Sequence, residues 1–208
     1  MNQQLIDYVE SEIIPRYRSF DKAHREDHAR SVIERSLALV PNFPEVDPDM
    51  VYAIAAFHDL GLVNGRENHH HDSKAIVLSD RFLPQIFTPV QISVIADAVE
   101  DHRASNSKPP RSVYGMIVAE ADRLIDPETI IRRTVQYGLA HYPEYDREWH
   151  YRRTLAHLKE KYGPDGYLKI WIPQSDNAMR LKGFHTIIAD EQKLRNYFDR
   201  IFDYESTH

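Results

Sequence analysis

The chain has 208 residues, a formal net charge of −6 and no cysteine. Without cysteine there is no disulfide and no thiolate ligand, so a bound metal would have to take nitrogen and oxygen donors. The negative charge argues against a broad basic surface for nucleic-acid polymers, but it leaves small phosphate compounds open. The sequence has no run of roughly 18 apolar residues and no typical signal peptide, so we expect a cytoplasmic protein without a membrane partner.

Helix-start signals recur along the chain. Asp47 and Asp126 each place an N-cap acceptor directly before a proline, and Thr88 is followed three places later by Gln91, as in a capping box. With only 7 glycines, the chain is therefore expected to be all-α, apart from residues 168–172, whose apolar alternation would also fit a short extended segment. The predicted helices cover residues 2–18, 23–40, 48–59, 71–82, 89–103, 112–125, 127–140, 146–162 and 177–203.

The segment 50–62 is apolar on all sides until it reaches His58 and Asp59. A helix of that kind is buried, and an ionised carboxylate at its end is costly unless it is paired or bound to a metal. Asp59 therefore needs a partner. A hydrogen bond to His58, a nearby arginine and a metal ion would each meet this need.

Two other polar residues occur in similar settings. His28 lies one helical turn before Val32 on an apolar stripe, and Asp122 follows Val118 by one turn. Alone, each is more often structural, as a packed histidine or as half of an ion pair. Two imidazoles and two carboxylates brought together would instead form a mixed site suited to a divalent transition metal, with positions open for water and substrate.

These four candidate ligands follow one another in a fixed order: His28, His58, Asp59 and Asp122. This order resembles the H…HD…D signature of the HD superfamily of metal-dependent phosphohydrolases. His24, four residues before His28, completes a pattern similar to the H-x-x-x-H opening of small bacterial members of that superfamily.

The resemblance covers about residues 20–125 and implies an all-α HD-domain helical bundle with the metal between its helices. We expect a single domain of residues 1–208, in which residues 126–208 form a C-terminal helical extension of the HD core. The four candidate ligands would bind a single divalent metal ion, with Mn, Fe, Co, Ni, Zn and Mg as candidates, and a second ion is left open. A homodimer is left open.

Two further histidine positions resemble those of family members that have extra histidines around the metal. His102 shares an apolar helix face with Val99, and a run of histidines opens the helix near residues 69–71. From this run we select His70. We expect His70 and His102 to be catalytic, with one of them donating a proton to the leaving group. The alternatives are a solvated helix start for the run and a packed structural role for His102.

Some basic residues are candidates for binding the phosphate oxygens of a substrate. Arg25 and Arg103 adjoin motif residues, so we expect them to be the substrate-binding pair. Arg111 and Lys22 are further candidates, although such side chains are more often solvated or in surface ion pairs.

The resemblance predicts a phosphohydrolase that acts on a small phosphate ester, with a nucleotide as the expected substrate, by means of metal-activated water. Leu62 stands where cyclic-di-GMP phosphodiesterases of the HD-GYP type have a lysine, so the sequence does not favour that subfamily. The alternatives are an HD-fold di-iron oxygenase, a non-catalytic nucleotide-binding module and a purely structural helical protein.

Overall fold

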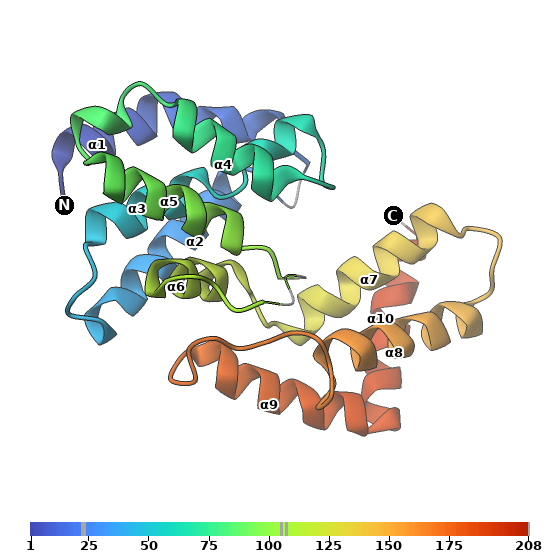
Figure 1. Cartoon of the computed structure of the whole chain (residues 1–208). Coiled ribbons are helices and arrows are strands. Elements are labelled where there is room, and N and C mark those ends of the chain that lie inside the picture. Colours follow the sequence, from blue (N-terminus) through green and yellow to red (C-terminus); the bar gives the residue numbers. More distant parts are fainter. Residues whose placement is uncertain (22–23, 105, 107, 208) are drawn as a thin grey trace. The chain divides into compact units, whose positions relative to one another are not determined.

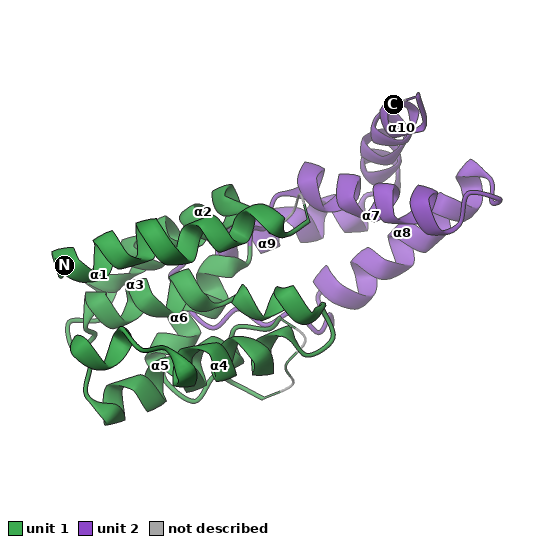
Figure 2. Cartoon of the chain, turned by 90° about the horizontal axis from the view of Figure 1, so that it is seen from above, with its two compact units in different colours: residues 1–123 green, residues 124–208 purple. Residues whose placement is uncertain are grey.

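The structure is a computed structural model that describes residues 1–21, 24–104, 106 and 108–207. In these residues it has ten α-helices, joined by short 3-10 and π-helical segments, and no strand (Figure 1). The expected all-α class is confirmed. The chain divides into two compact units, Met1–Arg123 and Leu124–His208, which are coloured separately in Figure 2. The expectation that residues 1–208 form a single domain stays a prediction.

The first unit contains six α-helices and five shorter helical segments. In chain order these are α1 Gln3–Tyr8, η1 Val9–Ile13, η2 Ile14–Ser19, α2 Glu26–Leu39, η3 Val40–Asn42, α3 Pro48–Phe57, η4 Leu60–Asn64, α4 His69–Ser79, η5 Leu83–Gln85, α5 Pro89–Asp101 and α6 Val113–Asp122.

The predicted helix starts at Asp47, Thr88 and Asp126 are confirmed by their N-cap hydrogen bonds. The backbone N–H of Gln91 donates to the Thr88 hydroxyl, and the Gln91 side chain accepts from the backbone N–H of Thr88, which completes the capping box. These contacts satisfy N–H groups that a helix cannot pair internally, so they fix where α3, α5 and α7 begin.

Helix α3 forms the centre of the first unit. All its residues from Met50 to Phe57 are buried, and it packs against α2, α5 and α6 (Figure 1). Because the helix is apolar on every side, only the interior of the unit can accommodate it. Its C-terminal end therefore delivers His58 and Asp59 into the interior, as the sequence predicts, and both side chains are buried.

The second unit contains α7 Pro127–His141, α8 Arg147–Tyr162, α9 Asp176–Ala189 and α10 Glu191–Thr207. The single helix predicted over residues 177–203 is wrong, because the chain breaks at Asp190. The Asp190 backbone is extended, and its carboxylate accepts a hydrogen bond from the backbone N–H of Lys193. Asp190 therefore acts as the N-cap of a new helix.

The possible extended segment at residues 168–172 is not a strand, although it belongs to no helix. Leu168 and Ile172 are buried without strand pairing.

None of the helices that the structure describes is long and apolar enough to cross a membrane.

Candidate metal centre

The turn after α3 holds His58 and Asp59 through contacts with the backbone. The Nδ1 atom of His58 lies 2.8 Å from the carbonyl oxygen of Ala55. The buried Tyr17 hydroxyl donates to the carbonyl oxygen of Ala56 over 2.9 Å and accepts a longer contact, 3.4 Å, from the backbone N–H of Asp59. These contacts leave Nε2 of His58 and both carboxylate oxygens of Asp59 for other partners.

The four residues expected as metal ligands converge in what we call the first cluster: His28, His58, Asp59 and Asp122. The Nε2 atom of His28 lies 3.2 Å from that of His58, 3.5 Å from Asp59 Oδ2 and 3.2 Å from Asp122 Oδ1. His58 Nε2 lies 3.3 Å from Asp59 Oδ2 and 3.9 Å from Asp122 Oδ1. Helices α2 and α6 and the end of α3 thus direct two nitrogens and two oxygens to one point.

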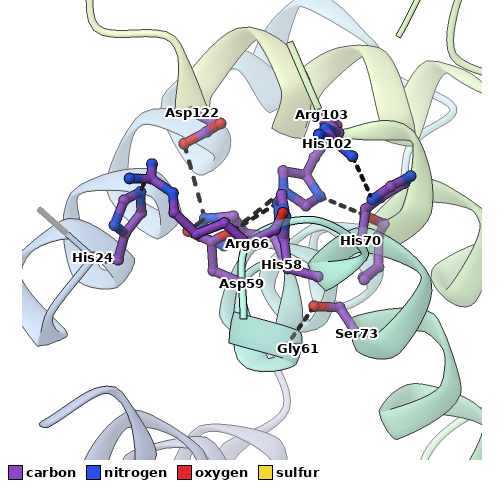
Figure 3. Close-up of polar contacts among 12 residues, drawn as sticks. His24, His58, Asp59, Gly61, Arg66, His70, Ser73, His102, Arg103 and Asp122 are labelled. Atoms are coloured by element: carbon purple, nitrogen blue, oxygen red, sulfur yellow. Dashed lines mark hydrogen bonds and ion pairs between the residues drawn. The ribbon is translucent and has the colours of Figure 1, made fainter. Parts of the chain in front are cut away.

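A second cluster forms on the other carboxylate oxygen of Asp59 and contains Asp59, His69 and His102. Asp59 Oδ1 lies 3.5 Å from Nε2 of His69 and 3.4 Å from Nε2 of His102. The two Nε2 atoms are 3.1 Å apart. Asp59 therefore joins the two clusters, with one carboxylate oxygen in each (Figure 3).

Three of the histidines share one orientation. In His58, His69 and His102, Nδ1 lies 2.6 to 2.8 Å from a backbone carbonyl oxygen. A carbonyl only accepts, so Nδ1 carries the hydrogen and, in the neutral ring, Nε2 presents its lone pair to the cluster. The Nε2 atoms of His69 and His102 lie 3.1 Å apart, so the two rings either share a proton or both bind one cation. This donor set fits a bound metal ion.

The carboxylates alter the proton affinity of the neighbouring rings. Burial alone would lower the pKa of His28, but hydrogen bonds and charge from Asp122 and Asp59 outweigh burial and raise this pKa to about 9. Burial also opposes the ionised form of both carboxylates, yet the adjacent histidines hold the pKa of Asp59 and that of Asp122 well below the ordinary value. The cluster thus attracts cations.

The sequence selects His70 from the histidine run, but this choice is corrected: His69 is the residue that lies in the second cluster. Helix α4 begins at His69, and the contact of its Nδ1 with the carbonyl oxygen of Arg66 turns Nε2 toward His102. His70, one position further round the helix, is buried elsewhere, with Nδ1 3.4 Å from Nη1 of Arg103. Burial and nearby positive charge lower the pKa of His70 to about 4.

Beside the clusters lies a cavity of about 150 Å³ whose charged lining includes Asp59, Asp122, Arg66 and Arg103. Figure 3 shows the two arginines, with Arg103 next to His102 and Arg66 reaching toward His24. The expected phosphate-binding residue Arg103 thus lines the cavity.

The other predicted phosphate-binding residues lie elsewhere or outside the described part of the chain. Arg25 is exposed at the start of α2 and is not among the described residues that line the cavity. Arg111 pairs with three carboxylates of α5, those of Asp97, Glu100 and Asp101. Lys22 lies outside the described residues.

Sequence reasoning missed Arg66 and Tyr17 altogether. Arg66 stands in a polar turn with no periodic pattern. The stripe that places Tyr17 in the core resembles that of any amphipathic helix, so neither residue carried a local signal. For His69 the signal was the histidine run itself, whose register becomes definite only where α4 begins.

Comparison with known families matches residues 25–125 to the HD domain. Comparisons with curated proteins and with solved structures gave no match. The matched segment contains all the members of both clusters and ends three residues after Asp122, which accords with the helical fold described above. Residues 25–125 of this chain therefore form a domain of the HD superfamily.

Proposed function

We propose that the protein is a metal-dependent phosphohydrolase whose two clusters would each hold a divalent ion, with Asp59 contributing one carboxylate oxygen to each. One observation carries this proposal. Each carboxylate oxygen of Asp59 faces a different pair of histidines, Oδ2 the pair in the first cluster and Oδ1 the pair in the second. HD domains bind divalent metals, and the superfamily consists largely of metal-dependent hydrolases, so the clusters provide what this chemistry requires.

The distances between donor atoms support the proposed ligand assignment. Around a common ion with bonds of roughly 2.1 Å, neighbouring donors lie roughly 3.0 to 3.4 Å apart. The donor contacts in the first cluster span 3.2 to 3.9 Å, and those in the second span 3.1 to 3.5 Å. His28, His58 and Asp122 would complete the first metal's shell, whereas His69 and His102 would complete the second.

When bound, divalent ions of this kind lower the pKa of a coordinated water and polarise phosphoryl oxygens. The chain's residues supply the positioning: the backbone contacts of His58, His69 and His102 fix the ring planes. Because its Nε2 lies within the second cluster, His102 fits a ligand role better than the proton-donor role expected from the sequence. A small phosphate ester, with nucleotides as the first class to screen, is the proposed substrate.

The test is metal content and phosphate release from untagged full-length protein reconstituted with Mn²⁺, Co²⁺, Fe²⁺ or Zn²⁺. The wild type should bind two ions per chain and release phosphate from at least one ester. Asp59→Ala should lose both ions and the hydrolysis together, since Asp59 serves both clusters. A matched surface variant, Asp7→Ala, should behave as the wild type. Hydrolysis by Asp59→Ala would refute the proposed chemistry.

A di-iron oxygenase is the second candidate, because four imidazoles and two carboxylates around a shared bridge also suit a pair of iron ions. The iron-loaded and manganese-loaded proteins separate the two candidates. Oxygen consumption that requires iron, without phosphate release under any metal, would favour the oxygenase. Nucleotide binding without turnover under all the metals tested would instead favour a binding module.

A further inference from the structure

Two arginines line the cavity beside the clusters, Arg66 and Arg103. Arg66 Nη2 lies 3.3 Å from Nε2 of His24, and Arg103 Nη1 donates to the carbonyl oxygen of Glu67 over 2.6 Å. In the part of the chain that the structure describes, neither guanidinium lies within 4.0 Å of a carboxylate oxygen. Arg111, by contrast, contacts three carboxylates.

Each of the two arginines donates to an acceptor that is not a carboxylate. His24 Nδ1 lies 2.8 Å from Asp21 Oδ1, which leaves Nε2 of the ring free to accept from Arg66. The Glu67 carbonyl does the same for Arg103. The side chains are thus oriented at the cavity while their positive charge remains available for an anion.

The cavity is small. Its volume of about 150 Å³ lies below the roughly 300 Å³ or more of pockets that take drug-sized ligands. A phosphate group fits within it, and the rest of a larger substrate would extend beyond it. A neighbouring cavity of about 330 Å³ shares Leu62 and Arg66 with the first and is also lined by Phe20 and Val63. The organic substituent of a phosphate ester would therefore have an apolar wall beside the phosphate.

From this arrangement, and resting on the proposed function, we propose that the substrate class is the phosphate monoester dianion, which Arg66 and Arg103 select against diesters. A monoester presents three terminal oxygens and two negative charges to the two guanidinium groups. A diester presents two such oxygens and one charge, and must also place a second substituent. In the reaction, water forms the new P–O bond, the ester P–O bond breaks, and the leaving alkoxide takes a proton, which yields an alcohol and inorganic phosphate.

The activity test compares p-nitrophenyl phosphate with bis(p-nitrophenyl) phosphate on the metal-loaded full chain, because the two esters share one leaving group. The wild type should favour the monoester in kcat/KM by roughly 100-fold or more. Arg66→Gln and Arg103→Gln should each lower monoester kcat/KM by roughly 10- to 100-fold, as expected for a lost charged hydrogen bond, and diester kcat/KM by less than roughly threefold. Arg81→Gln, at an exposed arginine outside the cavity, is the matched control.

A binding measurement separates this inference from the proposed function. Inorganic phosphate should bind the metal-loaded wild type, and each glutamine variant should raise its Kd by roughly tenfold, whereas dimethyl phosphate should bind weakly to all of the proteins. If no ester is hydrolysed but phosphate binds in this pattern, the proposed function fails and the selection of a dianion stands. Equal losses for monoester and diester, or a preference for the diester, would overturn the inference.

Discussion

Gly61 lies against the first residue of α4: a β-carbon built on Gly61 would lie 2.1 Å from the carbonyl oxygen of His69. The backbone N–H of Gly61 also donates to the buried Ser73 hydroxyl over 2.8 Å (Figure 3). Only a residue without a side chain allows the turn after Asp59 to approach α4 this closely. The glycine thereby brings His69 within reach of the Asp59 carboxylate.

We predict that Gly61→Ala separates η4 from α4. The added methyl group meets backbone atoms of His69 and Ser73, which cannot move without moving the helix, so we expect a loss of stability of roughly 1–3 kcal/mol. The bound metal should fall from two ions per chain toward one, because His69 leaves the second cluster. Thermal unfolding and metal analysis measure these effects.

Gly183→Ala is the matched control for this substitution. Gly183 lies within α9, and apart from its chain neighbours and its own helix backbone nothing lies within 4 Å of a β-carbon built there. Alanine favours helix over glycine, so this variant should be as stable as the wild type or slightly more stable, with its metal content unchanged. A Gly61→Ala protein that keeps two ions and the wild-type melting temperature would show that the close approach is dispensable.

Two members of the first cluster, His58 and Asp59, could be predicted from the sequence because they stand at the end of a strongly apolar helix. A buried His58 and Asp59 at the end of such a helix must have partners, and the order of the motif supplied His28 and Asp122. The HD domain match confirms the family that this order resembled.

The second cluster was harder to predict, because the face on which a helical residue lies depends on where the helix begins. Position 71 was the predicted start, whereas α4 begins at His69. A change of one residue rotates a side chain by roughly 100° about the helix axis, which is enough to exchange His69 for His70. The break at Asp190 was missed for a similar reason, since an aspartate within a helical pattern acts as an N-cap only when the chain turns there.

Tyr17→Phe should weaken the support of the turn that carries His58 and Asp59. The substitution keeps the buried ring but removes the hydroxyl that contacts Ala56 and Asp59. We expect the free energy of unfolding to fall by about 1 kcal/mol, the usual contribution of one hydrogen bond, with a larger fall in metal affinity than in stability. Tyr197→Phe, in the second unit, should leave metal affinity unchanged. Identical metal affinity in the two variants would argue against this support.

Protons should be released when metal binds at neutral pH. Because its pKa is raised to about 9, His28 is protonated in the metal-free protein at pH 7.5, but a metal ligand must be neutral. Calorimetric titrations in buffers with different ionisation enthalpies should give a release of at least about one proton per chain. No release at pH 7.5 would contradict the coupling between His28 and the two carboxylates.

The raised pKa of His28 also determines how the stability of the metal-free protein changes with pH. A raised pKa favours the protonated ring in the folded state, so the stabilising effect of His28 is complete below about pH 6.5 and is lost as pH rises through about 9. The melting temperature of the metal-free wild type should fall over this interval. His28→Gln should show a smaller fall, because glutamine does not titrate there.

The register of α4 predicts different effects on metal content for substitutions of His69 and His70. His69→Ala should reduce the bound metal from two ions per chain to one, since Nε2 of His69 faces both Asp59 and His102, and His102→Ala should give the same ratio. His70→Ala should keep two ions, because His70 contacts Arg103 and lies outside both clusters. The loss of a buried ring should nevertheless lower the melting temperature of His70→Ala. If His70→Ala loses an ion while His69→Ala keeps both, the helix register and the second cluster assigned here are wrong.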